Sequence, residues 1–196
     1  MSRTVTIAEL DQADRHLVEK ALHASIHAYA PYSGFAVGAA VRTRSAKTYA
    51  GANLENASYG VTICAEIAAT TAANSAGDQE IEAIAIVGHK FTTPQDSSQL
   101  VTPCGRCRQV IFEAAQVAKT DVRVFSCSGD LSKIMESTIS ELLPAAFGPA
   151  NLGLTEVWPK MRAKLRSAVA KLRANAFGGA ARPRHKGRRK RLAASG

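Results

Sequence analysis

The residues best suited to chemistry in this sequence are three cysteines and one glutamate, gathered in two short segments. Cys64 and Glu66 stand two residues apart, and farther along Pro103 precedes Cys104 and Cys107. Three thiolates can hold a Zn²⁺ ion and leave its fourth tetrahedral position to water, as a catalytic site requires. Glu66 can reach that water without binding the metal. A lone Cys-x-x-Cys would also fit a redox pair or half a structural site, but the full pattern predicts a catalytic zinc site.

A helix is predicted to begin at each of the two segments. Residues 64–75 are rich in alanine and are followed by Gly77, and residues 104–117 carry apolar side chains on one side. A helix N-terminus has a partial positive charge and free N–H donors, which stabilise thiolates. The predicted placement of the cysteines therefore suits metal binding.

Strands alternate with helices along the rest of the chain. The predicted elements are a helix over 7–29, strands over 35–41 and 48–52, the helix from 64, a strand over 81–88, the helix from 104, strands over 121–126 and near 133–135, and a short helix after 138. An opening hairpin followed by this alternation predicts an α/β layered domain with a mixed sheet.

The composition is that of a globular protein. The chain has 196 residues, of which 46% are hydrophobic and 21% charged, enough for one domain and an appendage. No run approaches the roughly 18 apolar residues of a membrane span, and the N-terminus lacks an apolar signal core. We therefore expect a cytoplasmic protein with no membrane partner, in which cysteines serve metal or catalysis. Cys127 is interpreted as an ordinary, partly buried cysteine.

The positive charge is confined to the C-terminal part of the chain. Residues up to Ala150 contain 12 Lys/Arg and 15 Asp/Glu, whereas those from Asn151 onward contain 13 Lys/Arg and only Glu156. We expect a catalytic domain over 1–152 and a basic extension over 153–196, with an amphipathic helix and then a disordered tail. Catalysis should not need this extension. Its charge would allow loose, strongly salt-dependent binding of nucleic acid or of anionic surfaces.

Taken together, these motifs resemble the small, tetrameric cytidine deaminases of nucleoside salvage. Cys-x-Glu followed by Pro-Cys-x-x-Cys is the zinc-deaminase signature, with Cys in the place sometimes held by His. The resemblance spans roughly residues 29–152 and runs through 29–40, 53–60, 64–66, 103–110 and 142–149. It implies a three-layer α/β/α fold with a mixed five-stranded sheet. It also implies one Zn²⁺ per subunit and a homotetramer with shared active sites.

The implied reaction is hydrolytic deamination of free cytidine and deoxycytidine to uridine and deoxyuridine, with release of ammonia, in pyrimidine salvage. Cys64, Cys104 and Cys107 would hold a zinc ion that acidifies water. Glu66 would carry the proton to the ring nitrogen and later to the leaving amine.

The resemblance also implies a set of substrate contacts. Asn53 and Glu55 would bind the ribose hydroxyls, and Phe35 would stack near the pyrimidine. The Ala65 backbone and the Thr102 carbonyl would read the base. Ala57 and Tyr59 would approach a neighbouring subunit's sugar, and Phe147 would cover a neighbour's base. The structural alternatives are a plain loop over 53–60, a core position for Phe35 and a C-terminal anchor for Phe147.

One position departs from the family pattern. Many members carry an arginine directly after the catalytic glutamate, where it bonds a zinc thiolate, but this chain has Ile67. We therefore expect Arg108 to donate to a cysteine sulfur and offset the charge of three thiolates. Arg106 is interpreted as a surface charge, or as a helper of Arg108.

Three other functions remain open at this stage. A zinc deaminase of another aminated heterocycle, such as a nucleoside antibiotic, would leave the sugar partners Asn53 and Glu55 without a role. A nucleic-acid-directed deaminase or binding protein would need the chain after Leu154. A structural zinc domain would leave Glu66 unexplained.

Overall fold

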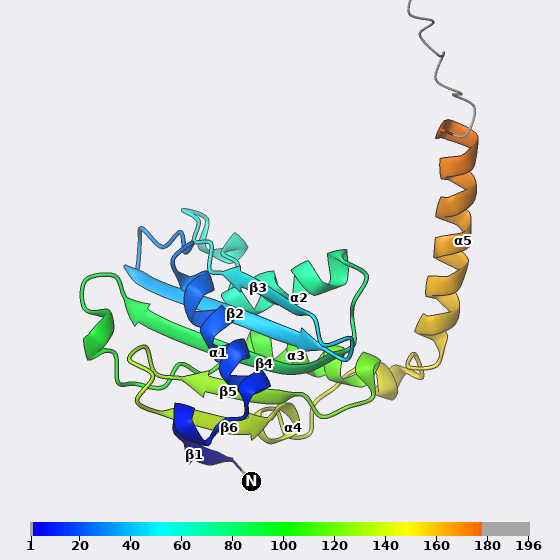
Figure 1. Cartoon of the computed structure of the whole chain (residues 1–196). Coiled ribbons are helices and arrows are strands. Elements are labelled where there is room, and N and C mark those ends of the chain that lie inside the picture. Colours follow the sequence, from blue (N-terminus) through cyan, green and yellow to red (C-terminus); the bar gives the residue numbers. More distant parts are fainter. Residues whose placement is uncertain (1, 178–196) are drawn as a thin grey trace, which may run out of the picture. The chain divides into compact units, whose positions relative to one another are not determined.

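The computed structural model describes residues 2–177, which fall into two compact units that meet between Thr155 and Glu156. The first unit is built on one mixed sheet (Figure 1). Its strands are β1 (Arg3–Val5), β2 (Phe35–Thr43), β3 (Thr48–Ala52), β4 (Ile81–Lys90), β5 (Arg123–Cys127) and β6 (Ile134–Thr138). They are ordered β1-β6-β5-β4-β2-β3. Only the neighbouring strands β4 and β5 run parallel, so the predicted mixed sheet is confirmed.

The predicted number of five strands is wrong, because β1 adds a sixth. This strand pairs antiparallel with β6, with Arg3 opposite Glu136 and Val5 opposite Ile134. β1 has only three residues, and Val5 alone is buried. So short a segment shows no period in the sequence. Its strand conformation depends on pairing with β6, which lies far away along the chain.

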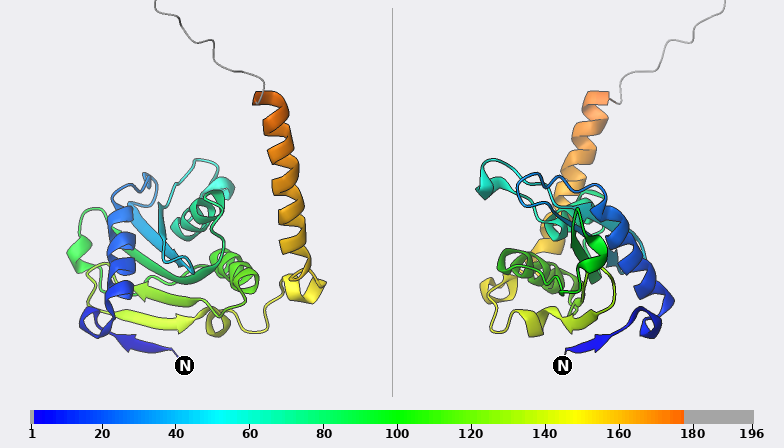
Figure 2. Two further views of the ribbon diagram at one scale, coloured as in Figure 1. Left: turned by 45° about the vertical axis from the view of Figure 1, so that its right-hand side comes forward. Right: turned by 90° about the vertical axis from the view of Figure 1, so that its left-hand side faces the viewer.

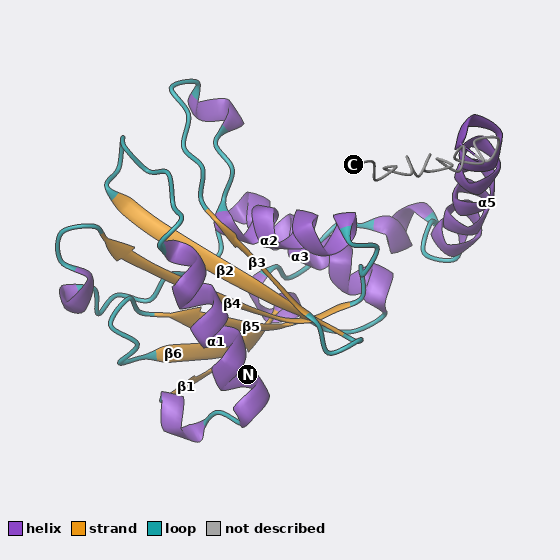
Figure 3. Cartoon of the chain, turned by 45° about the horizontal axis from the view of Figure 1, so that its top comes forward, coloured by secondary structure: helices purple, strands orange, loops and turns teal. Residues whose placement is uncertain are grey.

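Helices cover both faces of the sheet (Figures 2 and 3). They are α1 (Gln12–Ser25), α2 (Ala65–Ser75), α3 (Gly105–Ala118) and α4 (Ile139–Leu142). α1 packs on one face, and α2 and α3 lie on the other. The predicted three-layer α/β/α architecture is therefore confirmed.

Strand β4 separates two apolar cores. Ile84 and Ile86 pack with α2 and α3, whereas Ala85 and Val87 pack with α1. Successive side chains of a strand point to opposite faces, so a strand covered on both faces must be apolar throughout. Residues 81–88 are apolar except for Glu82, and a mostly apolar strand is typical of such a central position.

Helix α1 is shorter than the predicted range 7–29. The Asp11 side chain accepts a hydrogen bond from the backbone N–H of Asp14 at 2.8 Å and so caps the helix N-terminus. Leu10 is extended. At the other end the helix stops at Ser25, and four residues later Tyr29 donates its backbone N–H to the Asn53 carbonyl. The apolar period continues past both ends, but capping and strand-like pairing end the helix.

Two glycines let helices approach the sheet closely. A Cβ atom at Gly38 would lie 2.0 Å from the Ala21 carbonyl oxygen of α1. A Cβ atom at Gly51 would lie 2.5 Å from the backbone nitrogen of Ala69 in α2. Any side chain at these positions would push a helix outward, and α2 is the helix that carries Glu66.

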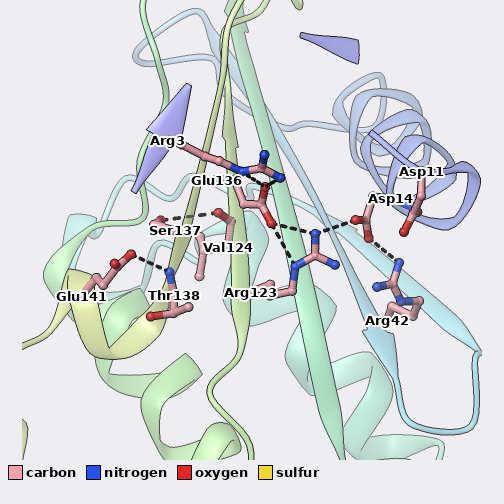
Figure 4. Close-up of polar contacts among 10 residues, drawn as sticks. All are labelled: Arg3, Asp11, Asp14, Arg42, Arg123, Val124, Glu136, Ser137, Thr138 and Glu141. Atoms are coloured by element: carbon pink, nitrogen blue, oxygen red, sulfur yellow. Dashed lines mark hydrogen bonds and ion pairs between the residues drawn. The ribbon is translucent and has the colours of Figure 1, made fainter. Parts of the chain in front are cut away.

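A chain of ion pairs ties five elements together (Figure 4). Asp14 of α1 is 2% exposed and binds Arg42 of β2 at 2.8 Å and Arg123 of β5 at 2.7 Å. Arg123 also binds Glu136 of β6 at 2.7 Å, and Glu136 binds Arg3 of β1 at 2.7 Å. A buried carboxylate is stable only when paired, and two arginines satisfy this one.

The second unit contains helix α5 (Val157–Phe177), which lies where the amphipathic helix of the basic extension was predicted. Almost all of its side chains are exposed. The predicted disordered tail lies beyond residue 177 and so outside the described residues. None of the described helices is both long enough and apolar enough to cross a membrane.

Candidate metal centre and active site

Two helix N-termini bring the three cysteines together. Cys64 is the N-cap of α2 and Cys104 the N-cap of α3, both with extended backbone, and Cys107 lies in the first turn of α3. Neither N-cap side chain is used in a capping hydrogen bond. Both sulfur atoms therefore remain available for another partner, next to the partial positive charge of a helix end.

The spacing of the sulfur atoms fits a zinc ion. The Sγ of Cys104 lies 4.0 Å from that of Cys64 and 3.5 Å from that of Cys107, and all three lie within 4.8 Å of one another. A tetrahedral ion about 2.3 Å from each sulfur requires sulfur atoms about 3.8 Å apart. Soft thiolate ligands also favour zinc over hard cations. The donor set therefore fits Zn²⁺ with one coordination position left over.

The pKa values of Cys64 and Cys107 are shifted in opposite directions. Hydrogen bonds from the Cys107 thiol and then from Arg106 lower the pKa of Cys64 to about 5, against the opposing effect of burial. The pKa of Cys107 is raised, first by its hydrogen bond to Cys64 and then by burial. Cys64 is thus the thiol that the surroundings stabilise most as an anion.

Arg106, not Arg108, contacts a cysteine sulfur, so the sequence expectation for Arg108 is wrong. Nη2 of Arg106 donates to the Thr62 carbonyl at 2.6 Å and lies 3.8 Å from Cys64 Sγ. Arg108 donates to the carbonyls of Pro103 and Leu142, both at 2.9 Å. The two arginines project from opposite sides of Cys107, because each helical residue turns by about 100°. Only Arg106 faces the segment before Cys64.

Glu66 is the second residue of α2 and is buried. Burial raises the pKa of Glu66, and the negative charge of Cys64 raises it further. A carboxyl group with a raised pKa can accept and release a proton near neutral pH. The raised pKa of Glu66 therefore suits the predicted role of proton carrier.

Phe35 lies against the segment that leads to Cys104. A Cβ atom at Gly88 would lie 2.8 Å from Cε1 of Phe35 and 3.0 Å from Val101 Cγ2. Gly88 therefore provides the space that the Phe35 ring occupies. The ring is only half-buried, which leaves part of it open beside the segment containing Thr102.

Asn53 and Glu55 are held by the backbone of neighbouring segments. The Asn53 side chain accepts from the N–H of Val37 at 2.9 Å and donates to the Phe35 carbonyl at 3.0 Å. Glu55 Oε2 accepts from the N–H groups of Tyr32 and Ser33 at 2.9 and 3.2 Å. Both backbone donors bind the same carboxylate oxygen, Oε2, whereas the Asn53 amide mainly joins its loop to β2.

The electrostatics of Glu55 favour its ionised form. The Ser33 hydroxyl, followed by the backbone N–H groups of Tyr32 and Ser33, lowers the pKa of Glu55. An ionised carboxylate is an acceptor only and binds hydroxyl donors strongly. The predicted contact with sugar hydroxyls suits this state.

The remaining predicted substrate residues lie at different depths. Ala65 is buried at the first position of α2, and Thr102 is exposed just before Pro103. Ala57, Tyr59 and Phe147 are exposed, with Tyr59 at 77% and Phe147 at 62%. The Phe147 carbonyl accepts from Gln109 of α3 at 2.9 Å. The roles of these five residues stay predictions.

Sequence reasoning missed several groups that shape the site. These are the backbone donors Tyr32 and Ser33 and the glycine Gly88, whereas Arg106 was considered only as a helper of Arg108. The turn at 31–34 was visible in the sequence, but no residue type reveals where a backbone N–H points. The position of Arg106 between two ligands was a signal, though an ambiguous one.

The family profile described as the cytidine and deoxycytidylate deaminase zinc-binding region matches residues 11–123. A cytidine deaminase of Halalkalibacterium halodurans is 44% identical over 131 residues, which are 67% of this chain and 91% of that protein. A cytidine deaminase of Sporosarcina psychrophila is 38% identical over 136 residues, which are 69% of this chain and 92% of that protein.

Solved structures give the same relationship. The cytidine deaminase of Burkholderia pseudomallei superposes with a TM-score of 0.60 at 38% identity, covering 70% of this chain and 100% of that chain. That of Mycobacterium tuberculosis has a TM-score of 0.56 at 35% identity, covering 70% and 99%. With the three-thiol cluster and the buried glutamate, these matches show that the chain belongs to the cytidine and deoxycytidylate deaminase family.

Proposed function

We propose that this protein catalyses the hydrolytic deamination of free cytidine and deoxycytidine to uridine and deoxyuridine, with release of ammonia. The observation that carries the proposal is the buried Glu66 carboxyl group beside three converging thiols in a chain of this family. The relatives at 44% and 38% identity are cytidine deaminases, and the matches cover more than nine tenths of their length. We place the activity in pyrimidine salvage in the cytoplasm.

Three cysteines of this chain would bind the metal, and neighbouring groups would offset their negative charge. Cys64, Cys104 and Cys107 would hold one Zn²⁺ per subunit, which when bound supplies a water of lowered pKa as nucleophile. Arg106 offsets part of the thiolate charge through Cys64. The helix N-termini of α2 and α3 contribute further positive potential.

Glu66 moves the protons. It accepts one proton from the attacking water and delivers it to the ring nitrogen next to the carbon that carries the amino group. As the carbon–nitrogen bond breaks, Glu66 transfers the second proton from the new hydroxyl to the amine, which leaves as ammonia. Burial raises the pKa of Glu66, so the carboxyl group can hold the proton between these steps.

The neighbouring segments would bind and orient the nucleoside. The backbone N–H groups of the neighbouring turn bind Oε2 of Glu55. The carboxylate would also accept a hydrogen bond from a ribose hydroxyl, with Asn53 beside it. The open part of the Phe35 ring would stack near the pyrimidine. The Ala65 N–H and the Thr102 carbonyl would read the edge of the base, so that the amidine carbon faces Glu66.

We further propose a homotetramer in which neighbouring subunits complete each site. Large apolar or aromatic side chains are exposed on the loop over 53–61, namely Leu54, Tyr59 and Val61, and before it at Tyr29 and Tyr32. The ring centroids of Tyr32 and Tyr59 lie 6.1 Å apart in an edge contact. Contiguous exposed apolar surface of this kind marks interfaces. Ala57 and Tyr59 would approach a neighbour's sugar, and Phe147 a neighbour's base.

The test is an ultraviolet assay of cytidine and deoxycytidine conversion by the zinc-loaded protein and by Glu66→Gln. The amide keeps the shape of the side chain but cannot carry a proton, so turnover should fall by about 10²–10⁴-fold or more while zinc content stays at one per subunit. Free cytosine, which lacks the sugar, should be a poor substrate.

Cys104→Ala provides the matching test of the metal site. This variant should lose zinc together with activity, and a variant that kept both would show that the ligand assignment is wrong. A zinc-loaded wild-type protein that converts neither nucleoside would overturn the proposed function.

A further inference from the structure

The side chains of α5 are sorted into three zones around the helix. With about 100° per residue, one face, about a third of the circumference, is apolar. It consists of Val157, Trp158, Met161, Leu165, Ala168, Val169, Leu172 and Ala176. Within the described residues, the five aliphatic and thioether side chains larger than alanine on this face are 39–67% exposed. The helix therefore presents an apolar stripe to its surroundings.

Basic residues border this stripe on both sides. Arg162, Arg166 and Arg173 follow one border, and Lys160, Lys164 and Lys171 follow the other. The face opposite the stripe is mostly small, with Ala163, Ser167, Ala170 and Ala174. No Asp or Glu occurs from Val157 to the end of the sequence, and residues 178–196 add seven more Lys/Arg.

We propose that α5 is a membrane-surface helix that binds a bilayer containing anionic phospholipid. The apolar stripe would enter the boundary between headgroups and acyl chains, with the helix axis in the plane of the membrane. Lysine and arginine at the borders of the stripe can bury their carbon stems and extend their charges to the lipid phosphates. The excess positive charge is complementary to an anionic leaflet.

The arrangement of the charges favours this partner over other anions. A nucleic acid could reach both basic rows from the small face, but it would then leave the apolar stripe in water. On the other side, its phosphates would press against Leu165 and Leu172, which lie between the rows. A second α5 helix packed in parallel along the stripe would bring the same cations together along the seam, which is repulsive. Only a surface that is apolar in depth and anionic at its edge fits all three zones.

This inference is independent of the proposed function. It departs from the sequence expectation of no membrane partner, which rested on the lack of a spanning segment. A helix that lies in the interface needs no such span. The catalytic unit would then be held near a membrane surface.

The test uses the full-length chain and sedimentation with vesicles of phosphatidylcholine alone or mixed with phosphatidylglycerol. The protein should sediment with the mixed vesicles and remain in solution with phosphatidylcholine. Trp158, the only tryptophan in the chain, lies on the apolar face. Its fluorescence should shift to shorter wavelength on binding.

Two matched double variants separate apolar insertion from charge. Leu165→Glu with Leu172→Glu places two acids on the stripe, and Ala163→Glu with Ala170→Glu places the same two on the opposite face. The first should bind the mixed vesicles at least about tenfold more weakly than the second, because only the first removes buried apolar surface. Replacing the three lysines with glutamine should weaken binding on the order of a hundredfold.

The following results would overturn the proposal. Equal vesicle affinities of the two double variants would mean that charge alone attracts the chain. Wild-type protein that stays in solution with anionic vesicles would exclude the membrane. Binding of a duplex DNA fragment with the same face dependence, in the absence of vesicle binding, would identify nucleic acid as the partner.

Discussion

At the residue scale, the central question is how the site tolerates three thiolates. A divalent ion with three thiolates carries a net charge of −1, which weakens its polarising effect unless neighbouring groups compensate. In this protein the compensating side chain is Arg106 of α3, which binds both the Thr62 carbonyl and Cys64 Sγ. Ile67, directly after Glu66, contributes no charge.

Arg106→Ala should lower zinc affinity by about 10- to 100-fold, the usual effect of losing a partner of a metal ligand. Arg106→Lys keeps the charge and should lose less. Competition with a chromophoric zinc chelator measures both variants. If Arg106→Ala bound zinc as tightly as the wild type, the contact with Cys64 would have no role in holding the metal.

Cys127 differs from the ligand cysteines because it has no place in the cluster. It is fully buried at the end of β5, and burial raises its pKa to about 12. A thiol of this kind is a small apolar core residue and reacts slowly. The sequence interpretation of a structural cysteine fits its position, although burial is complete rather than partial.

At the element scale, the site depends on how closely α2 lies on β3. The contact is made at Gly51, above which the backbone of Ala68 and Ala69 passes. α2 carries Cys64 at its N-cap and Glu66 in its first turn. A displacement of this helix would therefore move a ligand and the proton carrier together.

Gly51→Ala should destabilise the protein by about 1–3 kcal/mol, because the new methyl group would overlap α2. Gly60→Ala is the control, since no atom lies within 4 Å of a Cβ there and its φ is not positive. Chemical denaturation of the two variants measures the difference. Equal stabilities would show that α2 can move away without cost.

The attachment of β1 to β6 should depend on pH. Partial burial raises the pKa of Glu136, but hydrogen bonds and ion pairs with Arg123 and Arg3 outweigh it and leave the pKa below its ordinary value. A lowered pKa in the folded state means that the carboxylate stabilises the fold above its unfolded pKa, about 4.3–4.5. This stabilisation is lost as the pH falls through the folded pKa.

Glu136→Gln should therefore unfold at a lower temperature than the wild type at pH 7, and the gap should shrink below about pH 4. Thermal unfolding followed by circular dichroism across this range measures the gap. Glu113→Gln, at an exposed position on α3, is the control and should match the wild type. A gap for Glu136→Gln that stayed constant down to pH 3 would contradict the assignment.

At the scale of the whole molecule, the two units differ in content and in charge. The unit that ends at Thr155 contains the sheet, the cluster and Glu66. The unit from Glu156 contains α5 and the excess of positive charge. We propose a catalytic domain and a basic extension, with the boundary predicted at residues 152–153.

A chain truncated after Thr155 should therefore convert cytidine at close to the full-length rate and retain a mass four times that of its chain. Kinetics and light scattering measure the two properties. Loss of turnover by a folded, zinc-loaded truncated tetramer would favour a function directed by the extension. A monomer with full activity would contradict the proposed sharing of active sites.

The sequence by itself determined the chemistry and most of the fold. Ligand spacing, helix starts at Cys64 and Cys104, and the apolar pattern of β4 are local properties that the order of residues encodes directly. The short helix predicted after residue 138 is present as α4, where Glu141 accepts from the Thr138 backbone N–H at 3.1 Å. Patterns that span a few residues can be read before folding.

Only the tertiary structure decided which distant groups meet. β1 became a strand by pairing with β6, the chain beyond α1 paired at Tyr29 with the loop at Asn53, and Arg106 rather than Arg108 reached a cysteine sulfur. Each outcome depends on the side of a helix or strand that packing turns toward a segment far away in the sequence. Residue types and spacing define what a side chain can bind, and the packed elements select its partner.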